Sequence, residues 1–180
     1  MNKDIEKLLK EKNQGIKLDM GCGANKQGDD WVGIDYRKLP GVDIVHDLEE
    51  IPYPLPDGCA SVVAASHVLE HINPHKGVFI AVMNEIWRLL KIDGEFLISV
   101  PYAGSPGMRR DPSHCNELTE ETWEYFDPIS PLYQGGLYHI YNPLPWRVKF
   151  STWDVTGNME VALVKRRIDK SYNVNKDFLK

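Results

Sequence analysis

The sequence has few cysteines, no excess of positive charge and no long apolar run. Its only cysteines, Cys22, Cys59 and Cys115, are odd in number and widely spaced, which argues against a disulfide framework and favours a reducing, cytoplasmic setting. The 26 acidic residues outnumber the 21 basic ones, giving a net charge of −5, so general nucleic-acid binding is not expected. The N-terminus is charged, and neither a signal peptide nor a membrane span is predicted.

The chain does contain enough apolar material for a core. Hydrophobic residues make up 42% of its 180 residues and charged residues 26%, a composition typical of a globular domain. We expect one domain over residues 1–168, with a lid-like insert at 102–147, and a polar tail over residues 169–180.

Three short apolar runs near the N-terminus are each associated with an aspartate. The runs are residues 16–20, 31–34 and 42–46, and the aspartates are Asp19, Asp35 and Asp47. A glycine turn, Gly21 to Gly23, follows the first run. Short apolar runs broken by turns predict buried strands, and open α/β sheets bind ligands beyond the carboxyl ends of their strands. Three acceptors beside a glycine turn suit a ligand with hydroxyl groups and an amine.

A dinucleotide site is the first alternative, because its fingerprint also places a glycine turn after a strand. The third glycine of that fingerprint is missing, since Gly23 is followed by Ala24, Asn25 and Lys26. The carboxylate of Asp19 would also repel a pyrophosphate. The pattern therefore favours a ligand that carries an ammonium group.

The string Leu-Asp-Met-Gly-Cys-Gly, from Leu18 to Gly23, resembles motif I of the class I S-adenosylmethionine-dependent methyltransferases, in particular their compact type 11-like subgroup. Later landmarks follow in order as far as Pro101. The resemblance implies an α/β, Rossmann-like fold with a mostly parallel central sheet, helices on both faces and an antiparallel hairpin at the C-terminal end. It also implies S-adenosylmethionine as cofactor and S-adenosylhomocysteine as product.

The resemblance further implies how this cofactor is held. The implied binding residues are Asp19, Gly21, Cys22 and Gly23 at the methionine amine and carboxylate, Asp35 with the neighbouring Tyr36 at the ribose, Asp47 and Leu48 at adenine, and Ser66 and His67 beside the methionine part. Few residues separate Gly23 from Trp31, so the first helix is expected to be a single turn or absent. The methionine end would then depend more on other segments.

The segment His67 to His71 matches the H-x-x-E-H pattern of a class of zinc peptidases. A catalytic zinc would need a third protein ligand from elsewhere. The segment is already explained as the end of a central strand downstream of the cofactor-like turn, so no metal site is predicted. A divalent ion that orients substrate, as in some methyltransferases resembling this chain, stays an alternative. His71 is expected to be a hydrogen-bonded packing residue.

Two histidines are candidates for catalysis, His67 at the end of a strand and His114 in the insert. Methyl transfer from a sulfonium is an in-line displacement, so placement and desolvation supply much of the acceleration. A base is needed only if the acceptor must lose a proton, and histidine changes charge in the range that suits this role. Arg109 and Arg110, nearby in sequence, are candidates for binding an anionic acceptor.

The remaining pattern alternates helices and strands, as a mostly parallel sheet requires. Helices are predicted at 4–12, from Asn73 to a stop at Asp93 and Gly94, and at 119–126; strands at 61–65, 95–100, 149–154 and 159–165, the last two as a hairpin; and an extended surface loop at 51–56. The insert is irregular but rich in aromatic residues, which indicates order.

The sequence thus predicts an S-adenosylmethionine-dependent methyltransferase acting on a small-molecule or surface-presented acceptor. The alternative is a non-catalytic S-adenosylmethionine-binding module whose acceptor site has degenerated. The spacing of the residues identifies neither the acceptor nor the oligomeric state.

Overall fold

The computed structural model describes residues 15–130 and 143–169, together with residues 6, 7, 9, 10, 141 and 172. The described residues of the predicted N-terminal helix are helical, and Leu9 packs against the core. The rest of that helix, Tyr133 and Tyr138 of the insert and most of the predicted tail lie outside the described residues.

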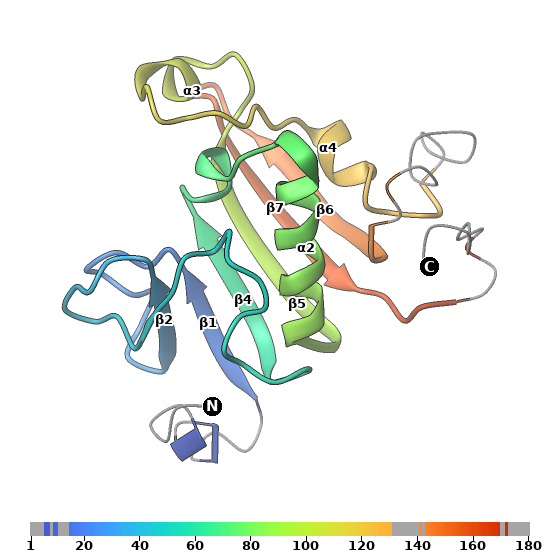
Figure 1. Ribbon diagram of the computed structural model, residues 1–180. Coiled ribbons are helices and arrows are strands. Elements are labelled where there is room, and N and C mark those ends of the chain that lie inside the picture. Colours follow the sequence, from blue (N-terminus) through green and yellow to red (C-terminus); the bar gives the residue numbers. More distant parts are fainter. Residues whose placement is uncertain are drawn as a thin grey trace.

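Seven strands form one sheet in the order β3-β2-β1-β4-β5-β7-β6 (Figure 1). They are β1 Ile16–Met20, β2 Trp31–Asp35, β3 Ile44–Val45, β4 Ala60–Ser66, β5 Leu90–Pro101, β6 Trp146–Trp153 and β7 Asn158–Lys165. The pairs among β1 to β5 are parallel, whereas β7 runs antiparallel to both β5 and β6. The predicted fold class and C-terminal hairpin are confirmed. The chain order reverses between β1 and β4, which is where such sheets bind ligands.

One long helix covers a face of this sheet (Figure 1). The helical elements are η1 Leu69–His71, η2 His75–Gly77, α2 Val78–Leu89, α3 Pro106–Arg110 and α4 Glu120–Glu124. Phe79, Val82 and Ile86 are buried on the inner side of α2, at the spacing that an amphipathic helix requires. The ring of Phe79 lies 6.0 Å from that of Phe126, edge to face, so the segment after α4 packs beside α2. No helix occurs in the described segment 21–30, as expected from its length.

The proline-rich segment at 51–56 was expected on the surface, but part of it enters the core. Tyr53 and Leu55 are 2% and 5% exposed, because polar groups on α2 satisfy the backbone around them. Glu85 Oε1 accepts a hydrogen bond from Tyr53 N, and Arg88 donates to the Leu55 carbonyl. The Tyr53 hydroxyl in turn donates to the Leu48 carbonyl. This network fixes the loop that follows β3.

The boundary between α2 and β5 differs from the prediction. The helix ends at Leu89 and the strand begins at Leu90, although Asp93 and Gly94 suggested a later stop. Leu90 is buried and pairs with Ala60, and the register shifts before Glu95 takes up regular pairing. Burial of Leu90 against β4 therefore extends the strand through the expected turn.

The short helix α3 was not predicted, although its signals are present in the sequence. Ser105 caps it by accepting a hydrogen bond from Met108 N, and Pro106 occupies its first turn, both of which are common at helix starts. The carboxyl ends of β1, β4 and β5 point toward the end of the molecule where α3 lies (Figure 1). None of the helices in the described part of the chain has the length and hydropathy needed to cross a bilayer.

Candidate active site

A cleft of about 520 Å³ opens beyond the carboxyl ends of β1, β2 and β4. This volume is typical of small-molecule sites. The cleft is lined by Gly21, Asp35, Tyr36, Arg37, Asp47, Leu48, Glu49, His67, Val68, His71, Ile72 and Ser113. Most of the predicted cofactor residues are thus brought together, whereas Asp19, Cys22, Gly23 and Ser66 do not line the cleft.

Asp35 is the most strongly held of these residues. Its carboxylate is 2% exposed and accepts hydrogen bonds from Gly23 N at 2.9 Å, from Arg37 N at 2.9 Å and from Arg37 Nε at 3.2 Å. Burial raises the pKa of Asp35, but these hydrogen bonds outweigh it, so the pKa lies below the usual value. Asp35 therefore remains ionised at neutral pH, and its negative charge faces the cleft.

The glycine turn after β1 comes very close to the segment after β4. Gly21 has a left-handed φ of 63°, and a Cβ added to it would lie 2.4 Å from Val68 Cγ2. Cys22 is buried behind the turn, with its sulfur against Gly33. Burial, assisted by nearby carboxylates, raises the pKa of the Cys22 thiol to about 11, which makes it a packing group and not a nucleophile.

Asp19 lies beneath the turn, 3% exposed, and its Oδ2 accepts a hydrogen bond from Gln27 N at 2.9 Å. Burial is the main influence on this group and raises the pKa of the carboxyl above its usual value. Its ionised form is therefore costly in the folded chain, and a cationic group placed nearby would offset that cost.

Asp47 and Leu48 form the wall of the cleft after β3. Asp47 is exposed, and its Oδ1 accepts from Glu49 N at 2.9 Å, which shapes the turn. Leu48 is buried, and its carbonyl is held by Tyr53. Several residues of the cleft were not among the predicted site residues; they include Arg37, which pairs with Asp35, and Ser113, which comes from the insert.

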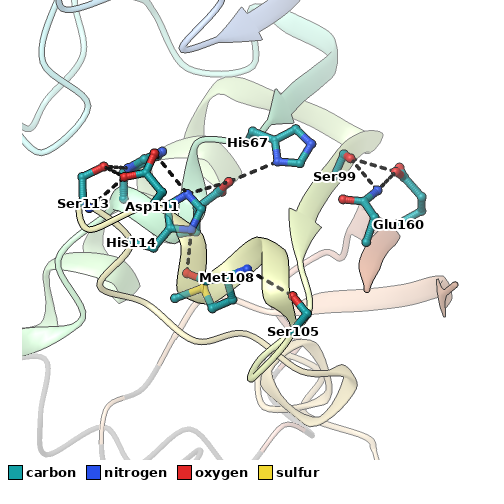
Figure 2. A network of polar contacts seen from close by, with 11 residues as sticks. His67, Ser99, Ser105, Met108, Asp111, Ser113, His114 and Glu160 are labelled. Carbon is teal, nitrogen blue, oxygen red and sulfur yellow. Dashed lines mark hydrogen bonds and ion pairs between the residues drawn. The ribbon is translucent and has the colours of Figure 1, made fainter. Parts of the chain in front are cut away.

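His67 follows β4 in an uncommon backbone conformation. Its φ is 54°, a left-handed value that costs energy for a residue with a side chain and that clusters at functional sites. Its amide donates to the Ser99 carbonyl at 2.8 Å, and its ring, with a side chain 58% exposed, lies with Nδ1 3.3 Å from Glu70 Oε1. Figure 2 shows His67 between Ser99 and Glu160 on one side and His114 on the other.

His114 reaches the same carboxylate from the insert. Its Nδ1 lies 3.0 Å from the Met108 carbonyl, and its Nε2 lies 3.9 Å from Glu70 Oε1. His114 does not line the cleft itself but an adjoining depression that also includes Arg109 and Asp111. Both predicted catalytic histidines therefore converge on Glu70, a residue that the sequence had offered only within the H-x-x-E-H pattern.

His71 is hydrogen-bonded and packs against another ring, as expected, and it also lines the cleft. Its ring is 4.7 Å from that of His114, edge to face, and its Nδ1 lies 3.1 Å from Ser113 Oγ. The H-x-x-E-H spacing could have marked it as a site residue, but its partner Ser113 is 42 residues away along the chain. Only the fold brings them together.

The sheet order and the family comparison agree on the identity of this domain. A family model described as a methyltransferase domain matches residues 18–98, the stretch that contains most of β1, all of β2 to β4 and α2, and most of β5. Over these residues the chain contains a methyltransferase domain of the S-adenosylmethionine-dependent kind, an enzyme class whose methyl donor is S-adenosylmethionine. A sequence search of curated proteins finds no match.

Solved methyltransferases share this fold at low sequence identity. A 16S rRNA (adenine(1408)-N(1))-methyltransferase from Catenulisporales acidiphilia is 17% identical with a TM-score of 0.59, covering 94% of this chain and 95% of its own. The 1,6-didemethyltoxoflavin-N1-methyltransferase of Burkholderia thailandensis is 16% identical with a TM-score of 0.58, covering 91% and 77%. An S-adenosylmethionine-dependent methyltransferase from Archaeoglobus fulgidus is 16% identical with a TM-score of 0.57, covering 89% and 91%. At these identities the likeness establishes the fold of the methyltransferase.

The close approach at Gly21 gives a first prediction. Gly21 and Gly23 both have left-handed φ values, but a Cβ at Gly23 would meet nothing within 4 Å. Gly21→Ala should therefore lower the free energy of unfolding more than Gly23→Ala, as measured by urea denaturation. Because the clash is with Val68, Val68→Ala should recover part of the loss in the double variant. Equal losses for the two glycines would contradict this account of the turn.

The raised pKa of Asp19 gives a second prediction. Since the folded chain favours the protonated carboxyl, ionisation of Asp19 opposes folding at neutral pH, and this opposition disappears as the pH falls below the raised pKa. Asp19→Asn should therefore raise the stability of the ligand-free protein at pH 7, with a difference from wild type that shrinks on acidification. Asp29→Asn, at an exposed carboxylate, is the control. A stability difference for Asp19→Asn that does not change with pH would count against a buried charge.

Proposed function

We propose that this methyltransferase binds S-adenosylmethionine in the cleft at the β1, β2 and β4 ends and transfers its methyl group to a small-molecule or surface-presented acceptor. The observation that carries the proposal is the buried, ionised carboxylate of Asp35 facing a cleft that Asp47 and His67 also line. Two acceptor groups and an imidazole around one cavity suit a ligand with a sugar, an amine and a reactive methyl group.

The residues of the cleft fit this cofactor. Asp35 offers carboxylate oxygens to the ribose hydroxyls, and its three existing donors hold it in place without occupying both oxygens fully. Asp47 and the Leu48 backbone lie where they can accept from and pack against adenine. Because Gly21 has no side chain, its backbone forms part of the cleft wall and is accessible to a ligand. Asp19, beneath the turn, supplies a negative charge for the ammonium group of the cofactor.

When bound, S-adenosylmethionine supplies an electrophilic methyl group on a positively charged sulfur. The protein then has to align the acceptor with that methyl group and exclude water from it. In this proposal His67, which is exposed at the end of β4 with Nδ1 3.3 Å from Glu70 Oε1, would take a proton from the acceptor. His114, in the adjoining depression, would contact the acceptor from the other side.

The acceptor would enter from the depression formed by the insert. Arg109 and His114 lie in it beside Asp111, so an acceptor with an anionic or hydrogen-bonding group would find partners there. The structural relatives act on an rRNA adenine and on 1,6-didemethyltoxoflavin, and the net charge of −5 makes the smaller kind of acceptor the better match here.

We also propose that residues 1–168 form a single domain that acts in the cytoplasm. Its three cysteines are free, which suits a reducing compartment.

Calorimetric titration of S-adenosylhomocysteine into the purified protein tests the proposal. Asp35→Ala should weaken binding by about 1–3 kcal/mol, because the ribose hydroxyls would lose a buried partner. Asp35→Asn keeps the shape and should weaken binding less, and Asp29→Asn, at an exposed carboxylate, should leave it unchanged. NAD should not bind. Unchanged affinity in a folded Asp35→Ala variant, or equal binding of NAD, would refute the assignment.

A further inference from the structure

Glu70 is a buried carboxylate without a hydrogen bond. The residue is 0% exposed, and neither side-chain oxygen has a hydrogen-bond partner among the described residues. Its backbone carbonyl accepts from both Cys115 N and Asn116 N, so its main chain is held firmly in place. Removing a carboxylate from water without a partner is costly. Two imidazole nitrogens approach this carboxylate, His67 Nδ1 at 3.3 Å and His114 Nε2 at 3.9 Å from Oε1, but neither makes a hydrogen bond to it. A cation bound directly to the carboxylate would compensate its charge.

His114 presents a nitrogen lone pair to this carboxylate. Its Nδ1 faces the Met108 carbonyl at 3.0 Å, and because a carbonyl can only accept, Nδ1 carries the hydrogen. In the neutral form of the ring, which is the form that binds metals, the other nitrogen, Nε2, has a lone pair; this atom lies 3.9 Å from Glu70 Oε1 and 4.0 Å from Asp111 Oδ2. Two atoms that both offer lone pairs do not bind each other. They can bind a cation placed between them.

His71 is oriented in the same way through a second set of contacts. Ser113 Oγ donates its single hydrogen to Asp111 Oδ1 at 2.5 Å, so it accepts from His71 Nδ1 at 3.1 Å. The lone pair of His71 is therefore on Nε2. Hydrogen bonding of Nδ1 to a carbonyl or a carboxylate-linked group is the arrangement that orients histidine ligands in metal sites. Figure 2 shows Asp111, Ser113 and His114 gathered on one side of the network.

We propose that Glu70, His71 and His114 bind a divalent first-row transition-metal ion, with Zn²⁺ as the representative. One donor atom from each residue lies within 4.8 Å of the others. Tetrahedral coordination at metal–ligand distances of about 2.0–2.2 Å places ligand atoms roughly 3.4 Å apart, so metal binding requires side-chain rotations that bring the donors closer together. Two imidazoles and one carboxylate favour Zn²⁺ and its neighbours over Mg²⁺ or Ca²⁺, which prefer oxygen ligands. Three protein ligands leave a coordination position open for a further ligand.

The proposed metal site lies where the cleft and the insert meet. His71 lines the cleft, and His114 lines the adjoining depression. A metal ion there could bind an oxygen of the acceptor and lower the pKa of its hydroxyl group, so that less is required of His67 as a base. This role rests on the proposed function, whereas metal binding itself does not.

Metal binding can be measured on the full chain without S-adenosylmethionine. Tag-free protein, dialysed against a chelator, is titrated with Zn²⁺ in competition with a chromophoric chelator. We expect one tight site per chain, with Zn²⁺ bound far more tightly than Mg²⁺. Glu70→Gln and His114→Gln should each weaken binding at least tenfold, and Ser113→Ala by about 10–100-fold, as loss of an orienting partner does. His75→Gln, at an exposed histidine outside the cluster, is the matched control and should bind as wild type does.

Thermal unfolding separates this site from a structural ion pair. Zn²⁺ should raise the Tm of wild type and of His75→Gln but not that of Glu70→Gln, because only a site in the native state shifts the equilibrium. Undiminished Zn²⁺ binding by a folded Glu70→Gln variant, or no stoichiometric binding by wild type, would overturn the proposal. S-Adenosylhomocysteine binding, measured on the same samples, reports independently on the cofactor cleft, so a failure of one proposal is distinguishable from a failure of the other.

Discussion

The hydrogen bond from Gly23 N to the Asp35 carboxylate ties the turn after β1 to the end of β2, and the cleft depends on it. No helix lies between these strands in the described chain, so the turn is held by this bond together with the backbone hydrogen bond from Cys22 N to the Ile34 carbonyl. The same carboxylate also holds Arg37 at the rim. A single buried charge thus fixes two walls of the cleft and still faces its interior. The approach of Gly21 to Val68 closes the third side.

Three buried carboxylates around the strand ends differ in how they are satisfied. Asp35 has enough donors to keep its pKa low, Asp19 has a raised pKa, and Glu70 has no hydrogen-bond partner in the described chain. Burial of charge is expensive in every case. These hydrogen-bond differences separate Asp35, which shapes the cleft, from Asp19 and Glu70, whose charges are poorly compensated. We propose that an ammonium group compensates Asp19 and a metal ion compensates Glu70.

Much of the fold could be predicted because local patterns and burial agree. The apolar runs at β1, β2 and β4, the stripe on α2 and the terminal hairpin all have the period of the element they form. The predicted start of β5 was wrong because burial of Leu90 against Ala60 outweighs the turn preference of Asp93 and Gly94. The prediction of a surface loop at 51–56 was wrong because Glu85 and Arg88, on a helix distant in sequence, form hydrogen bonds with the backbone of this segment. Such long-range partners have no local signal.

The site was predictable in part for the same reason. Asp35, Asp47 and His67 follow strands directly, so their place at one edge of the sheet follows from topology. The meeting of His71 with Ser113, and of His114 with Glu70, depends on how the insert folds back over η1. The hydrogen bonds from Cys115 N and Asn116 N to the Glu70 carbonyl hold the insert against η1. The sequence contains no pattern that indicates these bonds.

A crystal structure of the complex with S-adenosylhomocysteine would test the central claim most directly. The account predicts the ribose hydroxyls on the Asp35 carboxylate, adenine against Asp47 and Leu48, and the sulfur directed toward His67. The nucleoside bound outside this cleft, or bound within it with the ribose away from Asp35, would contradict it.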